Sequence, residues 1–208
     1  MKNWLTIFYL FISLFSFSQQ KQVMKMIEEG NAYYKKNQFA KAAEMYTKAV
    51  AADPSNNTAK FNQANAYYQS DKKTDAAIIF TEVTNTSIDK EMRSQAFYNK
   101  GVILTQQKNL DQSIEAYKNA LRNNSDDQEA RENLQKALLE LKKKNAEKKK
   151  EDGQQKKKKE DQKEKPASKM NPKEVEQLLK LLQQKEKEVQ QRVQKEKTKK
   201  EGSPAKDW

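Results

Sequence analysis

A 34-residue periodicity of small and large side chains constrains the fold more than any other feature of the sequence. The first occurrence, in a frame that begins at residue 23, consists of Gly30, Tyr33, Ala42, Tyr46, Ala49 and Pro54. The same frame recurs in Ala64, Tyr67, Ala76, Phe80 and Val83 and, after a three-residue insertion, in Gly101, Leu104, Ser113, Tyr117 and Ala120. Small side chains at this spacing let two antiparallel helices approach closely, and large ones fill the gaps beside them. The sequence therefore predicts an all-α protein with three helical hairpins at about 23–56, 57–90 and 94–127.

The order of small, aromatic, Ala, aromatic, Ala and Pro resembles the tetratricopeptide repeat (TPR). The resemblance covers residues 23 to about 125 and implies an α-solenoid that binds other proteins and has no catalytic residues. The departures are Lys60 at a position usually filled by an apolar residue, and Ile88 and Ser125 in place of the closing proline. We expect the connection around residues 84–92 to depart most from the repeat geometry.

A capping helix is predicted after the third repeat. A solenoid exposes an apolar face at its last repeat unless another element covers it. Ser125 followed three residues later by Gln128 is typical of a helix start. Apolar residues then recur at helical spacing, at Ala130, Leu134, Ala137, Leu138 and Leu141. We expect this cap at residues 127–144, which would bring the repeat domain to 19–144.

The N-terminal residues are typical of a secretory signal peptide. An apolar run of 13 residues extends from Leu5 to Phe17, and Ser16 and Ser18 place small residues before a cleavage point at Gln19. As a helix this run would be roughly 20 Å long, against a hydrocarbon core of about 30 Å. We expect cleavage of residues 1–18 and a periplasmic protein with possible membrane association; a retained membrane anchor is the alternative.

The chain contains neither cysteine nor histidine. Thiol nucleophiles, imidazole bases, disulfides and the usual zinc and copper ligands are therefore excluded together. No spacing of serines, lysines or carboxylates suggests an active site, so we expect no enzymatic activity, no cofactor and no metal.

A lysine-rich segment follows the predicted cap. Residues 142–169 contain 13 lysines and 6 acidic residues, whereas residues 19–141 contain 17 basic and 16 acidic residues. The charged fraction of 34% and the mean hydropathy of −1.15 also indicate that part of the chain is solvated. We interpret residues 145–171 as a disordered basic linker; contact with anionic lipid or cell-wall polymer is the alternative. Nucleic-acid binding is disfavoured because this segment has no aromatic side chain on which a base could stack.

A C-terminal amphipathic helix is predicted at residues 172–197, ahead of a flexible tail at 198–208. Pro172 suits a first helical position, and Val175, Leu179, Leu182, Val189 and Val193 lie on one stripe. We expect Val175, Leu178, Leu179, Leu182 and Trp208 to dock on a partner protein, with docking onto the chain's own repeats as the alternative.

The whole arrangement is similar to the BatC family of the bacterial aerotolerance (Bat) operon. The similarity rests on the export signal, the three repeats, the lysine-rich linker, a closing Lys-Asp-Trp and a helix in which Leu178, Leu179, Leu182, Glu186 and Gln190 fit. It implies a scaffold of the cell envelope whose partners are von Willebrand factor A-domain membrane proteins of the same operon.

The TPR resemblance also implies a ligand groove lined by the first helix of each repeat. The groove residues are then Ile27, Asn31, Tyr34, Phe61, Asn62, Asn65, Tyr68, Tyr98 and Thr105. Asn31 and Asn62 match the two asparagines by which some TPR proteins hold a peptide carboxylate, but Ile27, Gln95 and Asn99 stand where the cations of that clamp would be. A carboxylate without charge-assisted donors loses much of its affinity, so we expect an internal extended or helical segment as ligand. The alternative is that the asparagines bond only to each other or to nearby backbone.

Two functions follow from the sequence. The first is an envelope scaffold that binds partner proteins through the groove and the C-terminal helix. The second is a factor in cell-wall or outer-membrane assembly whose basic linker contacts anionic polymer or lipid.

Overall fold

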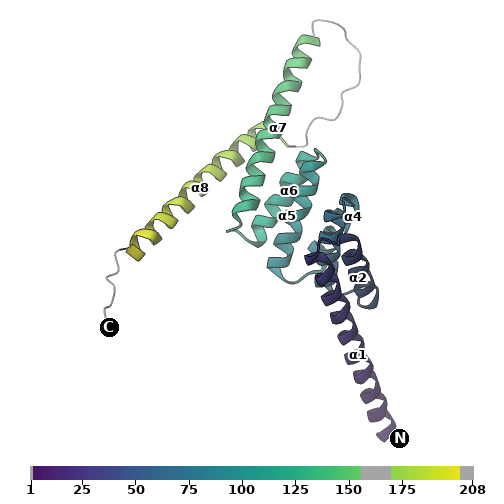
Figure 1. Cartoon of the computed structure of the whole chain (residues 1–208). Helices are drawn as coiled ribbons and strands as arrows, with labels where there is room; N and C mark the ends of the chain where they lie inside the picture. The colour runs from purple at the N-terminus through teal and green to yellow at the C-terminus, as the bar shows by residue number, and fades with distance from the viewer. Residues whose placement is uncertain (1, 156–169, 202–208) are drawn as a thin grey trace. The chain divides into compact units, whose positions relative to one another are not determined.

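The computed structural model describes residues 2–155 and 170–201, with side chains at 19–148 and 170–195. All regular structure in these ranges is α-helical, as the sequence predicts (Figure 1). The chain divides into two compact units, Met1–Ala130 and Arg131–Trp208. Residues 198–201 of the predicted tail belong to the last helix of the structure, whereas residues 202–208, with Trp208, and residues 156–169 of the predicted linker lie outside the described residues.

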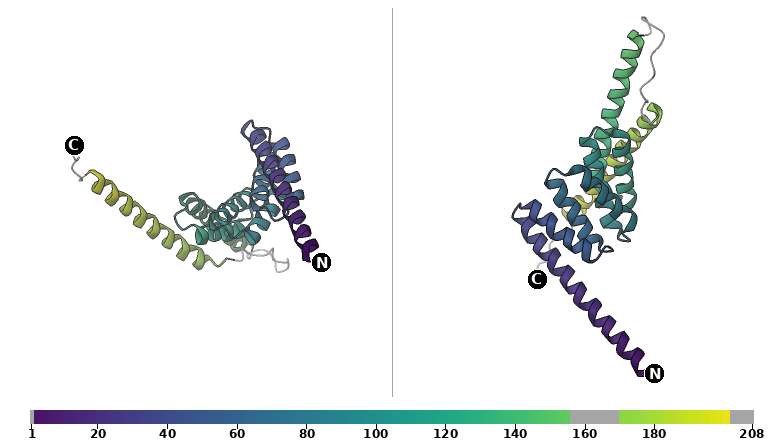
Figure 2. Two further views of the ribbon diagram at one scale, coloured as in Figure 1. Left: turned by 90° about the horizontal axis from the view of Figure 1, so that it is seen from below. Right: turned by 90° about the vertical axis from the view of Figure 1, so that its right-hand side faces the viewer.

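The first unit is a stack of helical hairpins. Its helices are α1 (Lys2–Lys35), α2 (Phe39–Ala52), α3 (Asn57–Gln69), α4 (Lys73–Thr86), α5 (Lys90–Gln106) and α6 (Leu110–Asn123). Each helix contacts the next one along the chain, so the hairpins follow one another in sequence order (Figures 1 and 2). This nearest-neighbour arrangement is that of a TPR-like α-solenoid.

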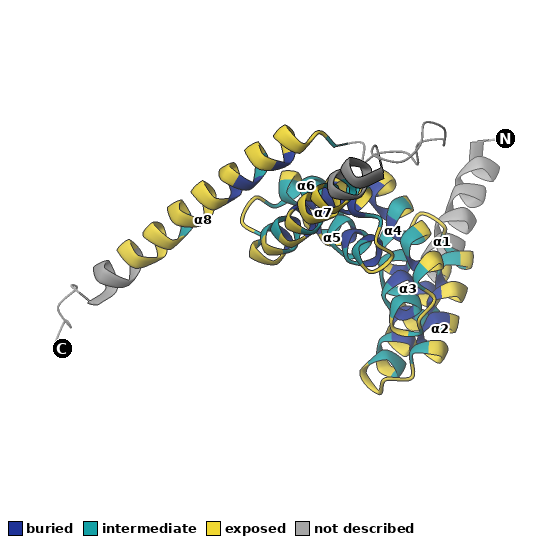
Figure 3. Ribbon diagram, turned by 90° about the horizontal axis from the view of Figure 1, so that it is seen from above, coloured by how far each residue is buried: buried dark blue, intermediate teal, exposed yellow. Residues whose placement is uncertain are grey.

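Two apolar clusters hold neighbouring hairpins together. The first joins α1 and α2 to α3 and contains Val23, Ile27, Ala42, Ala43, Tyr46, Ala49, Ala59 and Ala66. The second joins α3 and α4 to α5 and contains Ala64, Ala76, Phe80, Val83, Ala96 and Ile103. Figure 3 shows these buried faces turned toward adjacent helices. Neither of the first two hairpins therefore has a closed core of its own, since each cluster includes the first helix of the next hairpin.

The turns within the three hairpins share one backbone geometry. Asn37, Asp71 and Lys108 have φ of 57°, 61° and 60°, in the left-handed region. The following amide then bonds back to the carbonyl five residues earlier, at 3.0 Å for Gln38 to Tyr33 and 2.9 Å for both Lys72 to Tyr67 and Asn109 to Leu104. Asparagine and aspartate tolerate this conformation better than lysine does.

The three-residue insertion before the third repeat lengthens α5. This helix has 17 residues where α3 has 13. Asp89 caps its first turn by accepting from the amides of Glu91 at 2.9 Å and Met92 at 3.4 Å. The irregular connection expected around residues 84–92 is thus absorbed as an added helical turn.

The second unit contains most of α7 (Gln128–Gln155) and all of α8 (Pro172–Glu201). Asp127 caps α7 by accepting from the amide of Ala130 at 2.9 Å, so the N-cap is Asp127 and not Ser125. The helix continues eleven residues beyond the expected end at Lys144. Lysine and glutamate are good helix formers, which explains why a charged segment extends the helix.

Helix α8 begins at Pro172, as expected, and its first turn is closed by a reciprocal capping pair. Asn171 accepts from the amide of Lys173 at 3.1 Å, and Glu174 accepts from the amide of Asn171 at 3.2 Å. Within the part of the chain that the structure describes, none of the helices is both long enough and apolar enough to cross a membrane.

Two glycines lie directly against an aromatic ring of the paired helix. A Cβ atom on Gly30 would lie 2.5 Å from Cε1 of Tyr46, and one on Gly101 would lie 2.6 Å from Cε1 of Tyr117. Both tyrosines are at most 2% exposed, so neither ring has free space beside it. The glycine and the aromatic ring together set the distance between the two helices of the first and third hairpins.

We predict that Gly30→Ala lowers the free energy of unfolding by about 1–3 kcal/mol, although alanine favours helix over glycine by about 1 kcal/mol. The reason is the contact between the added methyl group and the Tyr46 ring. Urea unfolding of Gly30→Ala, Tyr46→Leu and the double variant forms a cycle that measures the coupling. If the two changes are additive, the ring contact is not the cause.

Candidate functional site

The first helices of the hairpins bring four asparagine amides together in pairs. Asn31 on α1 accepts from Nδ2 of Asn62 on α3 at 3.3 Å, and Asn65 on α3 accepts from Nδ2 of Asn99 on α5 at 3.2 Å. We call these four residues the amide ladder. Sequence analysis singled out Asn31, Asn62 and Asn65 but interpreted Asn99 only as a missing cation. The three-residue insertion hid the equivalence, because the partners are 31 apart in the first pair and 34 apart in the second.

Each amide of the ladder uses one of its two polar groups. Nδ2 of Asn31 and of Asn65, and Oδ1 of Asn62 and of Asn99, have no hydrogen-bond partner among the described residues. No buried side-chain nitrogen or oxygen is unpaired within that part of the chain, so these free groups are accessible to solvent. Each pair therefore presents one donor and one acceptor, which are the two groups that a peptide unit needs.

Aromatic side chains flank the ladder. Phe61 packs edge-on against Phe80 at 5.6 Å between ring centroids, and Tyr34 packs against Phe39 at 5.1 Å. The hydroxyl of Tyr68 accepts from Nε2 of Gln106 at 2.8 Å. The rings of Tyr34, Phe61 and Tyr68 are only partly buried and provide apolar contact area beside the amides.

Two predicted groove residues on α5 belong to a second polar cluster. Tyr98 lies 6.0 Å from Tyr117 between ring centroids, and the hydroxyls of Thr105 and Tyr117 are 3.1 Å apart. Burial, followed by a hydrogen bond to Glu129, raises the pKa of Tyr98 to about 12. Both residues are partly buried, and Thr105 also donates to the carbonyl of Gly101 at 2.9 Å.

A buried tyrosine fixes the orientation of the first ladder residue. The hydroxyl of Tyr46 donates to Oδ1 of Asn31 at 2.7 Å. Burial, with a smaller contribution from Tyr34, raises the pKa of Tyr46 to about 12, so the hydroxyl keeps its proton at neutral pH. Since Oδ1 of Asn31 already accepts two bonds, its Nδ2 is the group left for a ligand.

Ile27 is not a groove residue. It is 5% exposed and packs in the first apolar cluster, because it continues the apolar stripe that Val23 begins one turn earlier. The other two positions of the expected cation set are also engaged: Gln95 donates to Glu91 at 3.0 Å, and Asn99 belongs to the ladder. None of the three supplies a positive charge to a carboxylate.

The predicted C-terminal docking residues are largely covered by the chain itself. Val175, Leu179 and Leu182 are 1%, 7% and 7% exposed, and Leu178 is partly buried. Val193, the last residue of the predicted stripe, is 45% exposed, and Leu181 is 50% exposed. A partner could reach the leucine-rich edge of α8 only after displacing what covers it.

The described residues offer no chemistry beyond hydrogen bonding and apolar contact at this site. They contain no group of three or more acidic side chains that could hold a metal ion. Amides and phenols of raised pKa are poor general bases at neutral pH. The arrangement is suited to binding.

Comparison with sequence families identifies the repeats. Residues 27–87 and 94–127 match sequence models of the tetratricopeptide repeat. These ranges agree with the three hairpins, and the chain contains tetratricopeptide repeats. No curated protein is significantly similar to the chain in sequence.

Solved structures share the fold. The first TPR domain of Spaghetti (RPAP3), bound to the HSP90 peptide SRMEEVD, matches with a TM-score of 0.55 at 24% identity over 58% of this chain and 94% of that chain. The second TPR domain of human RPAP3, in complex with the HSP70 peptide SGPTIEEVD, matches with a TM-score of 0.53 at 24% sequence identity. This match covers 57% of this chain and 97% of that chain. The TPR2AB domain of yeast Sti1, in a pHSP90 complex, matches with a TM-score of 0.55 at 27% sequence identity. This match covers 62% of this chain and 50% of that chain.

We predict that alkaline pH destabilises the chain through Tyr46. Its folded pKa of about 12 lies above the unfolded value of 10.0, so its contribution is complete below pH 10 and is lost as the pH rises toward 12. In Tyr46→Phe, the free energy of unfolding should fall less steeply with pH over this range than in the wild type.

Urea denaturation at a series of pH values measures this slope. Tyr33→Phe is the control, because the Tyr33 hydroxyl makes no hydrogen bond within the described residues. An unchanged slope in Tyr46→Phe would contradict the assignment.

Proposed function

We propose that the repeats bind an extended segment of a partner protein along the amide ladder and that the chain acts as a non-catalytic scaffold. The supporting observation is a pair of asparagine amides between α1 and α3 and a second pair between α3 and α5. In each pair one amide N–H group and one amide oxygen have no hydrogen-bond partner among the described residues. An extended segment leaves its backbone N–H and C=O groups unpaired, and each ladder pair offers one acceptor and one donor to them. The binding of HSP90 and HSP70 peptides by structurally similar TPR domains adds support at the level of the fold.

We further propose that the ligand is an internal segment and not a chain terminus. The three positions that would carry cations hold Ile27, Gln95 and Asn99, and the first of these is buried. Hydrogen bonds to a charged group are worth about 1.5–3 kcal/mol, about twice the value of neutral ones, and this site does not supply them. The peptides bound by the structural neighbours therefore do not define the ligand of this chain.

We place this scaffold in the bacterial cell envelope, with von Willebrand factor A-domain membrane proteins as partners. The proposal rests on the apolar N-terminal run and on the resemblance to the BatC family of the Bat operon. Gln19, the first residue after the proposed cleavage point, donates from Nε2 to the carbonyl of Ala52 at 2.8 Å, and cleavage there would leave this contact in the mature chain.

We predict that Asn62→Ala/Asn65→Ala lowers partner affinity about tenfold or more, because two neutral hydrogen bonds of about 1 kcal/mol each are lost. The measurement is titration of the full chain with a purified A-domain partner. Asn85→Ala, a matched change at an exposed asparagine of α4 outside the ladder, is the control and should bind as the wild type does. Equal affinity of the ladder variant and the wild type would contradict binding through the ladder.

The preference for an internal segment is tested separately. Once a bound segment is mapped, its peptide is compared with a C-terminal carboxylate and with a C-terminal amide. We expect affinities within about threefold of each other, since no cation meets the terminus. A preference of tenfold or more for the carboxylate would contradict this part of the proposal.

The alternative function, in cell-wall or outer-membrane assembly, rests on the basic segment after Leu141. Deletion of residues 142–208 followed by a crosslinked pull-down separates the two functions. If the truncated chain still binds its protein partners and no longer binds anionic polymer, the assembly function is favoured. Loss of an A-domain partner would favour the scaffold and would indicate that α8 contributes to binding.

A further inference from the structure

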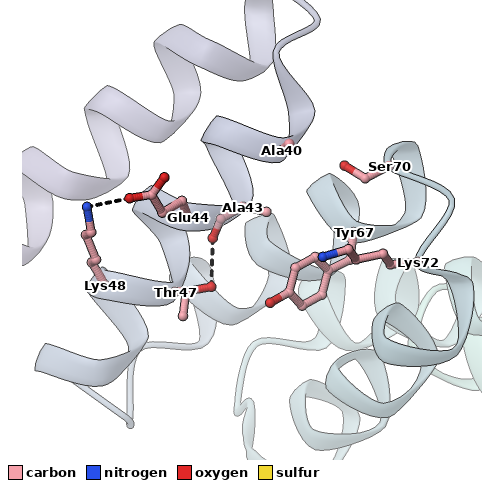
Figure 4. A pocket seen from close by; sticks show the side chains of 8 residues that line it. All are labelled: Ala40, Ala43, Glu44, Thr47, Lys48, Tyr67, Ser70 and Lys72. Atoms are coloured by element: carbon pink, nitrogen blue, oxygen red, sulfur yellow. Dashed lines mark hydrogen bonds and ion pairs between the residues drawn. The ribbon is translucent and has the colours of Figure 1, made fainter.

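A pocket of ≈ 390 Å³ lies between α2 and the turn that joins α3 to α4 (Figure 4). Its lining includes Ala40 and Ala43 from α2 and Tyr67 and Lys72 from the second hairpin. This volume is within the range of about 300–1,000 Å³ typical of ligand sites. None of its lining residues belongs to the amide ladder.

The pocket and the ladder are on different faces of α3. Successive residues of an α-helix are about 100° apart, so Tyr67 lies about 160° around the helix from Asn65. Gln63, on the Tyr67 side, donates to Oγ1 of Thr47 at 2.8 Å and holds this side of α3 against α2. Occupation of one site therefore leaves the other accessible.

The pocket combines an apolar floor with a cationic mouth. The Ala40 and Ala43 methyl groups and the Tyr67 ring provide the floor, and Nζ of Lys72 lies 5.4 Å from the centroid of that ring. Among the described residues, Lys72 has no carboxylate partner and the Tyr67 hydroxyl has no hydrogen bond. On the opposite rim Glu44 and Lys48 pair with each other at 2.7 Å, as Figure 4 shows. The unpaired charge at the mouth is thus positive.

A lysine at this turn position occurs in the second hairpin alone among the three hairpins, although in the first hairpin Nζ of Lys41 on α2 lies 5.7 Å from the centroid of the equivalent Tyr33 ring. The same backbone turn occurs in all three hairpins, and the residue in the place of Lys72 is Gln38 in the first and Asn109 in the third. The residue in the place of Tyr67 in the third hairpin is Leu104, which has no hydroxyl. The repeat fold therefore requires neither the ammonium group nor the hydroxyl at this position.

We propose that this pocket is a second docking site, which takes a segment of a partner protein in which an apolar side chain adjoins an aspartate or glutamate. The apolar side chain fills the space above Ala40 and Ala43 and packs on the Tyr67 ring. The carboxylate meets Lys72 and accepts from the Tyr67 hydroxyl. The proposal is independent of binding at the ladder, and the two sites together would let one repeat domain hold two protein segments at once.

The test is an NMR titration of the ¹⁵N-labelled full chain with the probe peptide acetyl-Gly-Phe-Asp-Gly-amide. We expect amide shifts at Ala40, Ala43 and Tyr67 that saturate with a single dissociation constant. Replacing the probe's aspartate by asparagine should weaken binding about fivefold, because an exposed ion pair contributes no more than that to affinity. Replacing its phenylalanine by alanine should also weaken binding about fivefold, because the apolar contact is small.

Two matched variants locate the cation. Lys72→Glu should weaken binding of the probe peptide about fivefold or more. Lys41→Glu makes the same charge change beside Tyr33 and should leave the affinity for the probe peptide unchanged. Asn65→Ala should also have no effect, which separates failure of this site from failure of the ladder. The proposal is overturned if the shifts occur at the ladder instead, if no shifts occur, or if Lys72→Glu binds the probe as the wild type does.

Discussion

The contact between a small residue and an aromatic ring determines how the two helices of a hairpin pair. In the first and third hairpins the ring of Tyr46 or Tyr117 occupies the space that a Cβ on Gly30 or Gly101 would need. In the second hairpin Ala64 and Phe80 occupy the same positions and are fully buried. Each apolar cluster also includes the first helix of the next hairpin. The distance between the two helices of one hairpin therefore affects the position of the next hairpin. The positions of all groups on the first helices, including the amide ladder, depend on it.

The fold could be predicted from the sequence because side-chain volume at fixed spacing restricts paired helices more than polarity does. The helices of the first unit form the three expected hairpins, although α1 begins at Lys2, well before the repeat frame that starts at residue 23. The sequence could not show how the insertion before the third repeat would be accommodated, since either a longer loop or a longer helix satisfies the same residues. Asp89 decides in favour of the helix by capping two amides of its first turn. The end of α7 was placed too early because a change in composition at Lys144 is not a helix stop when lysine and glutamate follow.

The site was less predictable than the fold because its residues are defined by pairing across repeats. Asn31 and Asn62 could be singled out by comparison with a known peptide site, but their bond to each other depends on the packing of α1 against α3. The Asn65 and Asn99 pair repeats this contact one step along the solenoid, and an alignment corrected for the insertion would have revealed it. Ile27 was assigned to the groove from its register, yet Val23 one turn earlier marks the same face as part of the core. Register alone cannot distinguish an apolar groove position from a core position.

Helix α3 leaves polar and aromatic side chains partly exposed on two of its faces. Three of its four buried residues are alanines, Ala59, Ala64 and Ala66, which occupy little volume and allow close backbone contact on both sides. The larger residues Phe61, Asn65, Tyr67 and Tyr68 are therefore left partly exposed, in two groups that point in different directions. A helix with one wide apolar stripe could not do this, since its large side chains would be consumed by the core. Because α3 packs through alanines, it lacks a conventional amphipathic pattern, and its polar and aromatic side chains stay partly exposed, where a ligand could reach them.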